Sequence, residues 1–256
     1  MTTVRDIYNC LDEFAPFRTQ MSFDNSGLLA GSPDAEVRTV LLALDITPDV
    51  VREAASGGAQ LIVSHHPVIF NPLRSLVPGT APYLLAQNGV AAVCAHTNLD
   101  LAPGGVNTCL AERLGLLDVG TLETDKATGL PCALAGRTAR ALEPREFAAS
   151  VKKALGCDGL FYTDGRRNIT RAGLCSGAGA DSLRAAAESG CEAFVTGEAK
   201  HHEMIDAENL GVTLVVAGHY FTENVVIGPL AGRLGERFPE VAFVRSEASH
   251  CPVMAL

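Results

Sequence analysis

The stretch TVLLALDITPDVVREAASGGAQLIVSHHP, residues 39–67, decides the fold class. Its first part, Thr39 to Ile46, is almost continuously apolar and begins with β-branched residues, which is typical of a strand buried on both faces. A helix follows, because Thr47 can cap its N-terminus, Pro48 suits the first helical position and a Gly-Gly pair can end it. The next strand, Gln60 to Ser64, ends just before two histidines. This strand–helix–strand order predicts parallel neighbours in one sheet.

The same alternation continues outward from this stretch. A helix, a strand and a further helix are expected over Pro82–Gln87, Val90–Ala95 and Gly105–Leu114. After the polar residues 123–129, the sequence predicts strands over Pro131–Gly136, Asn168–Leu174, Glu192–Val195, Val212–Ala217 and Val241–Arg245. Helices are expected over Glu143–Leu155, Asp181–Ser189, His202–Asn209 and Glu223–Arg237. We therefore expect two α/β domains with mainly parallel sheets, residues 1–125 and 126–256, and a C-terminal segment of about 225–256 that could pack back on the first domain.

Composition limits the classes of function. The chain has 256 residues, 47% of them apolar, and a formal net charge of −9. Such an acidic chain is a poor binder of nucleic acid or of anionic membranes, because both attract clustered Lys and Arg. Its eight cysteines include no C-x-x-C pair, which favours reduced thiols in the cytoplasm. No apolar run approaches the ~18 residues of a membrane span.

Imidazole and carboxylate groups follow three of the predicted strands. They are His65 and His66, His96 and Asp100, and His219 and Glu223. Ligands of parallel α/β sheets bind at the carboxyl ends of strands, and neighbouring strands lie about 4.8 Å apart, so these groups can converge. Each histidine taken alone is more often a hydrogen-bonded structural residue. Together the six favour a metal site over that structural interpretation.

The spacing of these residues indicates what the site could bind. Neighbouring side chains of an extended chain point in opposite directions, so His65 and His66 suit two different ions. His219 and Glu223 share one helical face, and either Asp100 or Glu223 could bridge two cations. Mixed nitrogen and oxygen ligands suit Zn, Fe, Mn or Co better than Ca or Mg. A site without cysteine is more often open and catalytic than closed and structural.

Several motifs together resemble one known family. They are SHHP at 64–67, HTNLD at 96–100 and GHYFTE at 218–223, accompanied by FDNSGLL at 23–29, LDIT at 44–47 and TGEAKHHEM at 196–204. In this order they resemble the YbgI-like dinuclear metal-centre family, whose members are often labelled homologues of a type 2 GTP cyclohydrolase I. In the early segment, Phe23 stands where the family often has Trp.

The resemblance implies a more specific site. Its metal ligands correspond to His65, His66, Asp100, His219 and Glu223, and His96 would lie beside the metals as a hydrogen-bonding neighbour or proton carrier. It also implies that the metals lie between the two domains and that the chain forms a homohexameric ring.

Two functions are open on these grounds. The first is a metal-dependent hydrolase acting on a small molecule such as a nucleotide, with two divalent transition-metal ions acidifying water and with His96 and Glu223 as catalytic residues. The alternative is a non-catalytic metal-binding, metal-handling or assembly protein. Adjacent His201 and His202 could contact a substrate, although such a pair is more often polar surface. The turn at residues 176–179 could hold a phosphate or simply open a helix.

Overall fold

The computed structural model describes residues 1–255 and contains two compact units. One unit consists of Met1–Pro103 and Ile227–His250, and the other of Gly104–Val226 with the residues from Cys251 onward. Each unit is built around its own β-sheet. The expectation of two α/β domains is therefore confirmed, and the last long helix and strand of the chain belong to the first unit.

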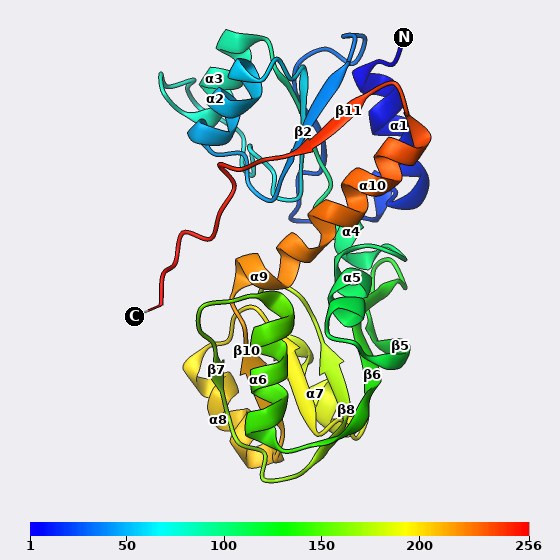
Figure 1. The fold of residues 1–256 in the computed structure, drawn as a ribbon, viewed down its shortest axis with the longest axis vertical. Helices are drawn as coiled ribbons and strands as arrows, with labels where there is room; N and C mark the ends of the chain where they lie inside the picture. Colours follow the sequence, from blue (N-terminus) through cyan, green and yellow to red (C-terminus); the bar gives the residue numbers. More distant parts are fainter. Residues whose placement is uncertain (256) are drawn as a thin grey trace. The chain divides into compact units, whose positions relative to one another are not determined.

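The sheet of the first unit has the strand order β1-β4-β3-β2-β11. Its strands are β1 (Gly27–Ala30), β2 (Thr39–Ala43), β3 (Leu61–Ser64), β4 (Ala91–Cys94) and β11 (Ala242–Arg245). Four of them run parallel, and β1 pairs antiparallel with β4 at one edge. Figure 1 shows helices α2 (Pro48–Ser56) and α3 (Ala81–Asn88) on one face of this sheet, and α1 (Val4–Phe14) and α10 (Ile227–Arg237) on the other.

The helix and the buried strands predicted from residues 39–67 are present in the structure. The Thr47 hydroxyl accepts a hydrogen bond from the backbone N–H of Val50 at 3.3 Å, which caps α2, and proline occupies the first turn. Every residue of β3 and β4 is buried, as covering both faces of a parallel sheet requires. One face packs Ile62 and Ala92 against Val50 and Leu85 of the covering helices.

The second unit contains a mixed sheet with the order β5-β6-β8-β9-β10-β7. Its strands are β5 (Leu117–Thr124), β6 (Pro131–Leu142), β7 (Phe161–Tyr162), β8 (Ile169–Leu174), β9 (Ala193–Thr196) and β10 (Thr213–Val216). Strands β8, β9 and β10 are parallel, and the outer pairings are antiparallel. One core cluster joins α5 (Val106–Arg113) and α6 (Pro144–Leu155) to this sheet, and another joins α7 (Leu183–Glu188) and α8 (His201–Leu210) to it.

Two boundaries differ from the sequence prediction. The units divide between Pro103 and Gly104, not near residue 125, because Leu110 and Ala111 of α5 pack into the same core as α6. The helix predicted over Glu223–Arg237 is interrupted: α9 (His219–Glu223) is followed by a 3₁₀ turn, η3 (Asn224–Val226), before α10 begins.

Among residues 1–255, no helix combines the length and the apolar character needed to cross a bilayer.

Candidate metal centre

Three histidines meet at the carboxyl edge of the first unit's parallel strands. His65 and His66 directly follow β3, and His96 follows β4 and precedes the short helix α4 (Thr97–Leu101). One ring nitrogen from each of the three lies within 4.8 Å of the others. Two nitrogens bound to one zinc ion lie about 3.4 Å apart, so this group is close to the spacing that a metal requires.

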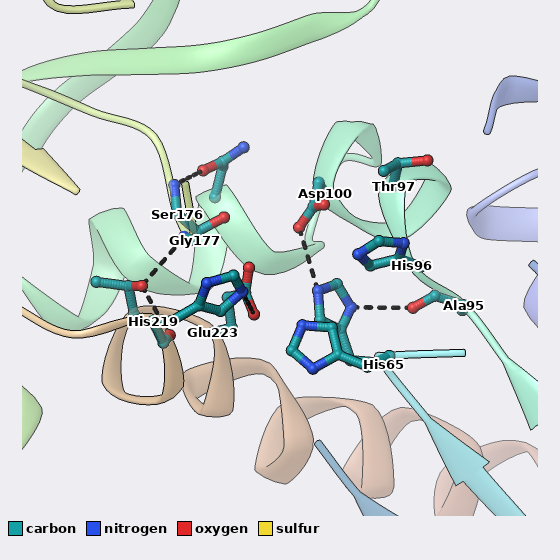
Figure 2. A network of polar contacts seen from close by, with 12 residues as sticks. His65, Ala95, His96, Thr97, Asp100, Ser176, Gly177, His219 and Glu223 are labelled. Carbon is teal, nitrogen blue, oxygen red and sulfur yellow. Dashed lines mark hydrogen bonds and ion pairs between the residues drawn. The ribbon is translucent and has the colours of Figure 1, made fainter. Parts of the chain in front are cut away.

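Asp100 adds a carboxylate to this group. It lies on α4, one turn beyond His96, and its Oδ1 lies 3.6 Å from Nε2 of His65 (Figure 2). The His65 side chain is fully buried, whereas that of Asp100 is 21% exposed. The first unit therefore carries three imidazoles and one carboxylate that can act as ligands.

Oxygen acceptors fix the orientation of the two adjacent histidines. Nδ1 of His65 lies 3.0 Å from the carbonyl oxygen of Ala95 (Figure 2), and Nδ1 of His66 lies 2.7 Å from Oδ1 of Asp45. Carbonyl and carboxylate oxygens only accept, so each Nδ1 carries the proton when the imidazole is neutral. Each Nε2 then has the lone pair that a metal ion needs.

His96 is held in the same way by a buried carboxylate. Its Nδ1 lies 2.8 Å from Oδ1 of Asp24, whose side chain has no exposed surface. The other oxygen of Asp24 accepts from the backbone N–H of Thr97 at 3.0 Å and from the Ser26 hydroxyl at 3.0 Å. Burial raises the pKa of Asp24, but hydrogen bonds from His96 and Thr97 outweigh it and hold that pKa well below its usual range. Asp24 is therefore a carboxylate at neutral pH.

The second unit presents His219 and Glu223 on α9. They are four residues apart on one helical face, with Nε2 of His219 2.9 Å from Oε2 of Glu223. Nδ1 of His219 lies 2.9 Å from Oε1 of Glu198, so this ring is oriented like the other three. The Glu223 side chain is only 5% exposed.

Glycines around α9 leave room for these two side chains. A Cβ at Gly177 would lie closer than 3.0 Å to a carboxylate oxygen of Glu223 and 3.3 Å from Nε2 of His219. A Cβ at Gly197 would lie 2.8 Å from the Cα of His219. The backbone N–H of Gly177 also donates to the Thr222 hydroxyl at 3.1 Å (Figure 2). The turn therefore fits tightly around α9, a feature that neither sequence interpretation of residues 176–179 included.

The remaining predicted residues lie elsewhere. His201 and His202 begin α8, both are exposed, and neither belongs to the groups of candidate ligands found among residues 1–255. His202 instead lines a small pocket of about 160 Å³ with Asp181, Arg184 and Asp206.

The sequence analysis identified neither Asp45 nor Glu198 as a group that orients a histidine. Asp45 follows β2 on the same sheet edge as His66, and Glu198 follows β9 beside the strand that precedes His219. An acidic residue just beyond a neighbouring strand is the signal that could have identified both.

The donor set fits a metal ion. Three imidazoles in the first unit and that of His219 in the second have Nδ1 fixed on an oxygen acceptor and lie near a carboxylate, an arrangement that suits a divalent transition metal. The structure therefore contains groups of histidine and acidic side chains that can hold a metal ion.

Comparisons with known proteins agree with this description. The family model Duf34/NIF3 (NGG1p interacting factor 3) matches residues 2–252. A Clostridium perfringens protein named "GTP cyclohydrolase 1 type 2 homolog" is 28% identical over 97% of this chain and 98% of its own length. The crystal structure of the Staphylococcus aureus hypothetical protein SA1388 is 28% identical and covers 99% of each chain with a TM-score of 0.93. The protein ybgI, of unknown function, shares the fold at 22% identity, with a TM-score of 0.82 over 97% of this chain and 100% of its own. The resemblance inferred from the motifs is thus confirmed, and the chain belongs to the Duf34/NIF3 family.

Proposed function

We propose that this chain holds two divalent transition-metal ions, such as Zn, Fe, Mn or Co, and is a hydrolase acting on a small molecule such as a nucleotide. The ligands in this proposal are His65, His66 and Asp100 of the first unit and His219 and Glu223 of the second. One observation carries the proposal: the three histidine ligands, and His96 beside them, have Nδ1 bonded to an oxygen acceptor. Structural histidines have no need of a common tautomer, whereas metal ligands do.

Bound metal would acidify a water molecule and stabilise negative charge developing on the substrate. The protein's own contribution to proton transfer would come from His96. Its Nδ1–H is fixed on Asp24, so its Nε2 can take a proton from the attacking water and return it to the leaving group. The Asp24 carboxylate would stabilise the imidazolium formed in that step. The side chain of Glu223 is buried, so its carboxylate would face the metals and not bulk water.

The substrate class comes from a relative's name and from the donor set. The name of the Clostridium perfringens relative, "GTP cyclohydrolase 1 type 2 homolog", indicates a nucleotide, GTP. Imidazole and carboxylate ligands that hold divalent metal ions suit hydrolysis at carbon or phosphorus. We therefore propose a nucleotide as the first substrate to test.

Elemental analysis of protein purified without added metal tests the metal proposal. We expect about two equivalents of metal in wild type, and little in the double variant His66→Ala with Asp100→Ala. His250→Ala, which changes an exposed histidine bonded only to Ala248, is the matched control and should keep the metal. Thermal unfolding of all three proteins establishes that the fold survives. Wild type that is metal-free and takes up no added Zn, Fe, Mn or Co would contradict the proposal.

Turnover is tested separately, with the metal found. Glu223→Gln should keep its fold and lose metal-dependent hydrolysis on a panel of nucleotides. If wild type instead binds metal, exchanges it readily and hydrolyses none of the panel, the alternative of a metal-handling protein replaces the hydrolase.

We further propose that the chain self-associates as a homohexameric ring. The edge strand β5 exposes Leu117 and Val119, and the opposite edge strand β7 exposes Phe161 at 74%. Exposed apolar residues on edge strands favour pairing with other chains. Light scattering should give six times the mass of the chain, and a monomer would contradict this proposal.

A reducing compartment, the cytoplasm, fits the state of the thiols. Among residues 1–255 the eight cysteines form no disulfide, and most of them are buried.

A further inference from the structure

Two exposed phenylalanines lie next to the histidine group of the first unit. Phe23 is 60% exposed and Phe70 is 44% exposed, although burial of such rings normally stabilises a protein. Their ring centroids lie 6.4 Å apart at an angle of 38°. This tilt is neither a parallel stack nor an edge-to-face contact, so both rings keep faces available for another partner.

The two phenylalanines are held in place by the chain segments that carry them. The side-chain amide of Asn25 donates to the carbonyl oxygen of Ile69 at 2.7 Å, which ties the segment of Phe23 to that of Phe70. Asp24, the residue after Phe23, is anchored on His96. Their proximity to the candidate site is therefore built into the fold.

The rings form a continuous series leading outward from the candidate ligands. The ring centroid of buried His65 lies 5.1 Å from that of His96. The His96 centroid lies 6.4 Å from that of Phe70, with an edge-to-face angle of 77°. The Phe70 centroid in turn lies 6.4 Å from that of Phe23. Exposure increases along the series, from 0% for the His65 side chain to 60% for Phe23. A ligand with its reacting atom at the histidines would thus place its next ring against the phenylalanines.

We propose that Phe23 and Phe70 form a binding subsite for a planar aromatic ring of the ligand, such as a nucleobase. This inference rests on the proposed function and adds to it the residues that would select the ring. A ring between two parallel phenyl groups needs a centroid separation of about 7 Å, twice the optimal carbon contact distance. That is only slightly wider than the present 6.4 Å, so a small rotation of exposed side chains admits the ring.

Calorimetric titration with two probes, guanosine monophosphate and ribose 5-phosphate, tests the subsite. The second probe lacks the base and serves as a reference for contacts with sugar and phosphate. Zn-loaded wild type should bind the nucleotide at least 10-fold more tightly. Phe23→Ala and Phe70→Ala should each weaken nucleotide binding about 5- to 100-fold, the range for losing one base–aromatic stack, and leave ribose 5-phosphate unchanged.

Two further variants separate stacking from general apolar contact. Phe23→Leu keeps an apolar side chain without a planar face and should recover only part of the lost affinity. Ile205→Ala removes an exposed apolar side chain on α8 and should bind both probes like wild type. Thermal unfolding midpoints of the variants show whether each is folded.

Several results would overturn the subsite. They are equal affinity of wild type for the two probes, no nucleotide binding by folded, Zn-loaded wild type, or an equal loss in Ile205→Ala. A drop in particle mass in Phe23→Ala would assign the pair to an interface between copies of the chain. Metal content measured on the same samples separates this outcome from failure of the metal proposal. If no metal binds, titration of the metal-free protein still compares the two probes.

Discussion

Replacing Gly177 by alanine should displace the Glu223 carboxylate and weaken metal binding. Gly177 has φ of 59°, and its added Cβ would lie closer than 3.0 Å to a carboxylate oxygen of Glu223. To regain a normal contact of about 3.5 Å, the carboxylate must retreat by roughly an ångström. Metal–ligand distances tolerate about 0.2 Å, so a ligand that moves this far is lost or severely weakened.

Gly129→Ala is the matched control for this substitution. Gly129 has φ of 70°, but an added Cβ would meet no atom within 4 Å. Both variants therefore incur the cost of a left-handed alanine, about 1–2 kcal/mol. Only Gly177→Ala also disturbs Glu223, so a difference between the two variants reports the displaced carboxylate.

Thermal unfolding with and without metal measures that difference. At a free metal concentration 1,000 times the wild-type Kd, binding stabilises the folded state by about 4.1 kcal/mol. We expect Gly177→Ala to bind about 100-fold more weakly, which reduces the stabilisation to about 1.4 kcal/mol at the same concentration. Gly129→Ala should keep the full metal-induced stabilisation of about 4.1 kcal/mol. Equal metal-induced stabilisation in the two variants would refute the assignment of Glu223 as a ligand held by this turn.

Three further predictions concern carboxylates. Asp24→Asn removes a buried acceptor of several hydrogen bonds and should lower the free energy of unfolding by about 3 kcal/mol. The control Asp34→Asn changes an exposed carboxylate and should lower it by about 0.5 kcal/mol or less. Chemical denaturation measures both free energies. Glu198→Ala removes the carboxylate that accepts from Nδ1 of His219. Metal affinity measured by chelator competition should fall about 10- to 100-fold. The thermal unfolding midpoint of the metal-free protein should not change. Burial raises the pKa of Glu53, but hydrogen bonds from Ser246 and two backbone N–H groups outweigh it, so the net shift is downward. Its stabilisation is therefore present above the unfolded value of 4.5 and is lost as pH falls through the lower folded value. The free energy of unfolding of Glu53→Gln should be lower than that of wild type at pH 7, and the two values should converge at the acid end of a pH series.

The clustering of the candidate ligands was predictable because it depends on local order along the chain. A parallel strand ends at the same edge as its neighbours, so residues just after β3 and β4 must lie together. His65 and His96 follow those strands directly, and Asp100 is one helical turn further. Continuous apolar runs likewise marked the buried strands. These features require no knowledge of distant contacts.

The remaining features depend on contacts between distant segments. The orienting residue Asp45 reaches His66 only because β2 and β3 pair in one particular register. Strands β1 and β7 are short edge strands with weak sequence patterns, and α5 belongs to the second unit through its packing. Gly177 could be assigned to a phosphate turn or to a helix entry from sequence, because its approach to Glu223 is visible only in the folded chain.

The orienting acceptors also favour a cation at these sites. In the first unit, the carboxylates of Asp24, Asp45 and Asp100 lie beside the imidazoles of His96, His66 and His65. In the second unit, Glu198 and Glu223 both contact His219. Carboxylates placed close together repel one another, and burial strengthens that repulsion because the local dielectric constant falls. A metal cation bound to the Nε2 lone pairs would offset this repulsion, so the carboxylates favour metal binding.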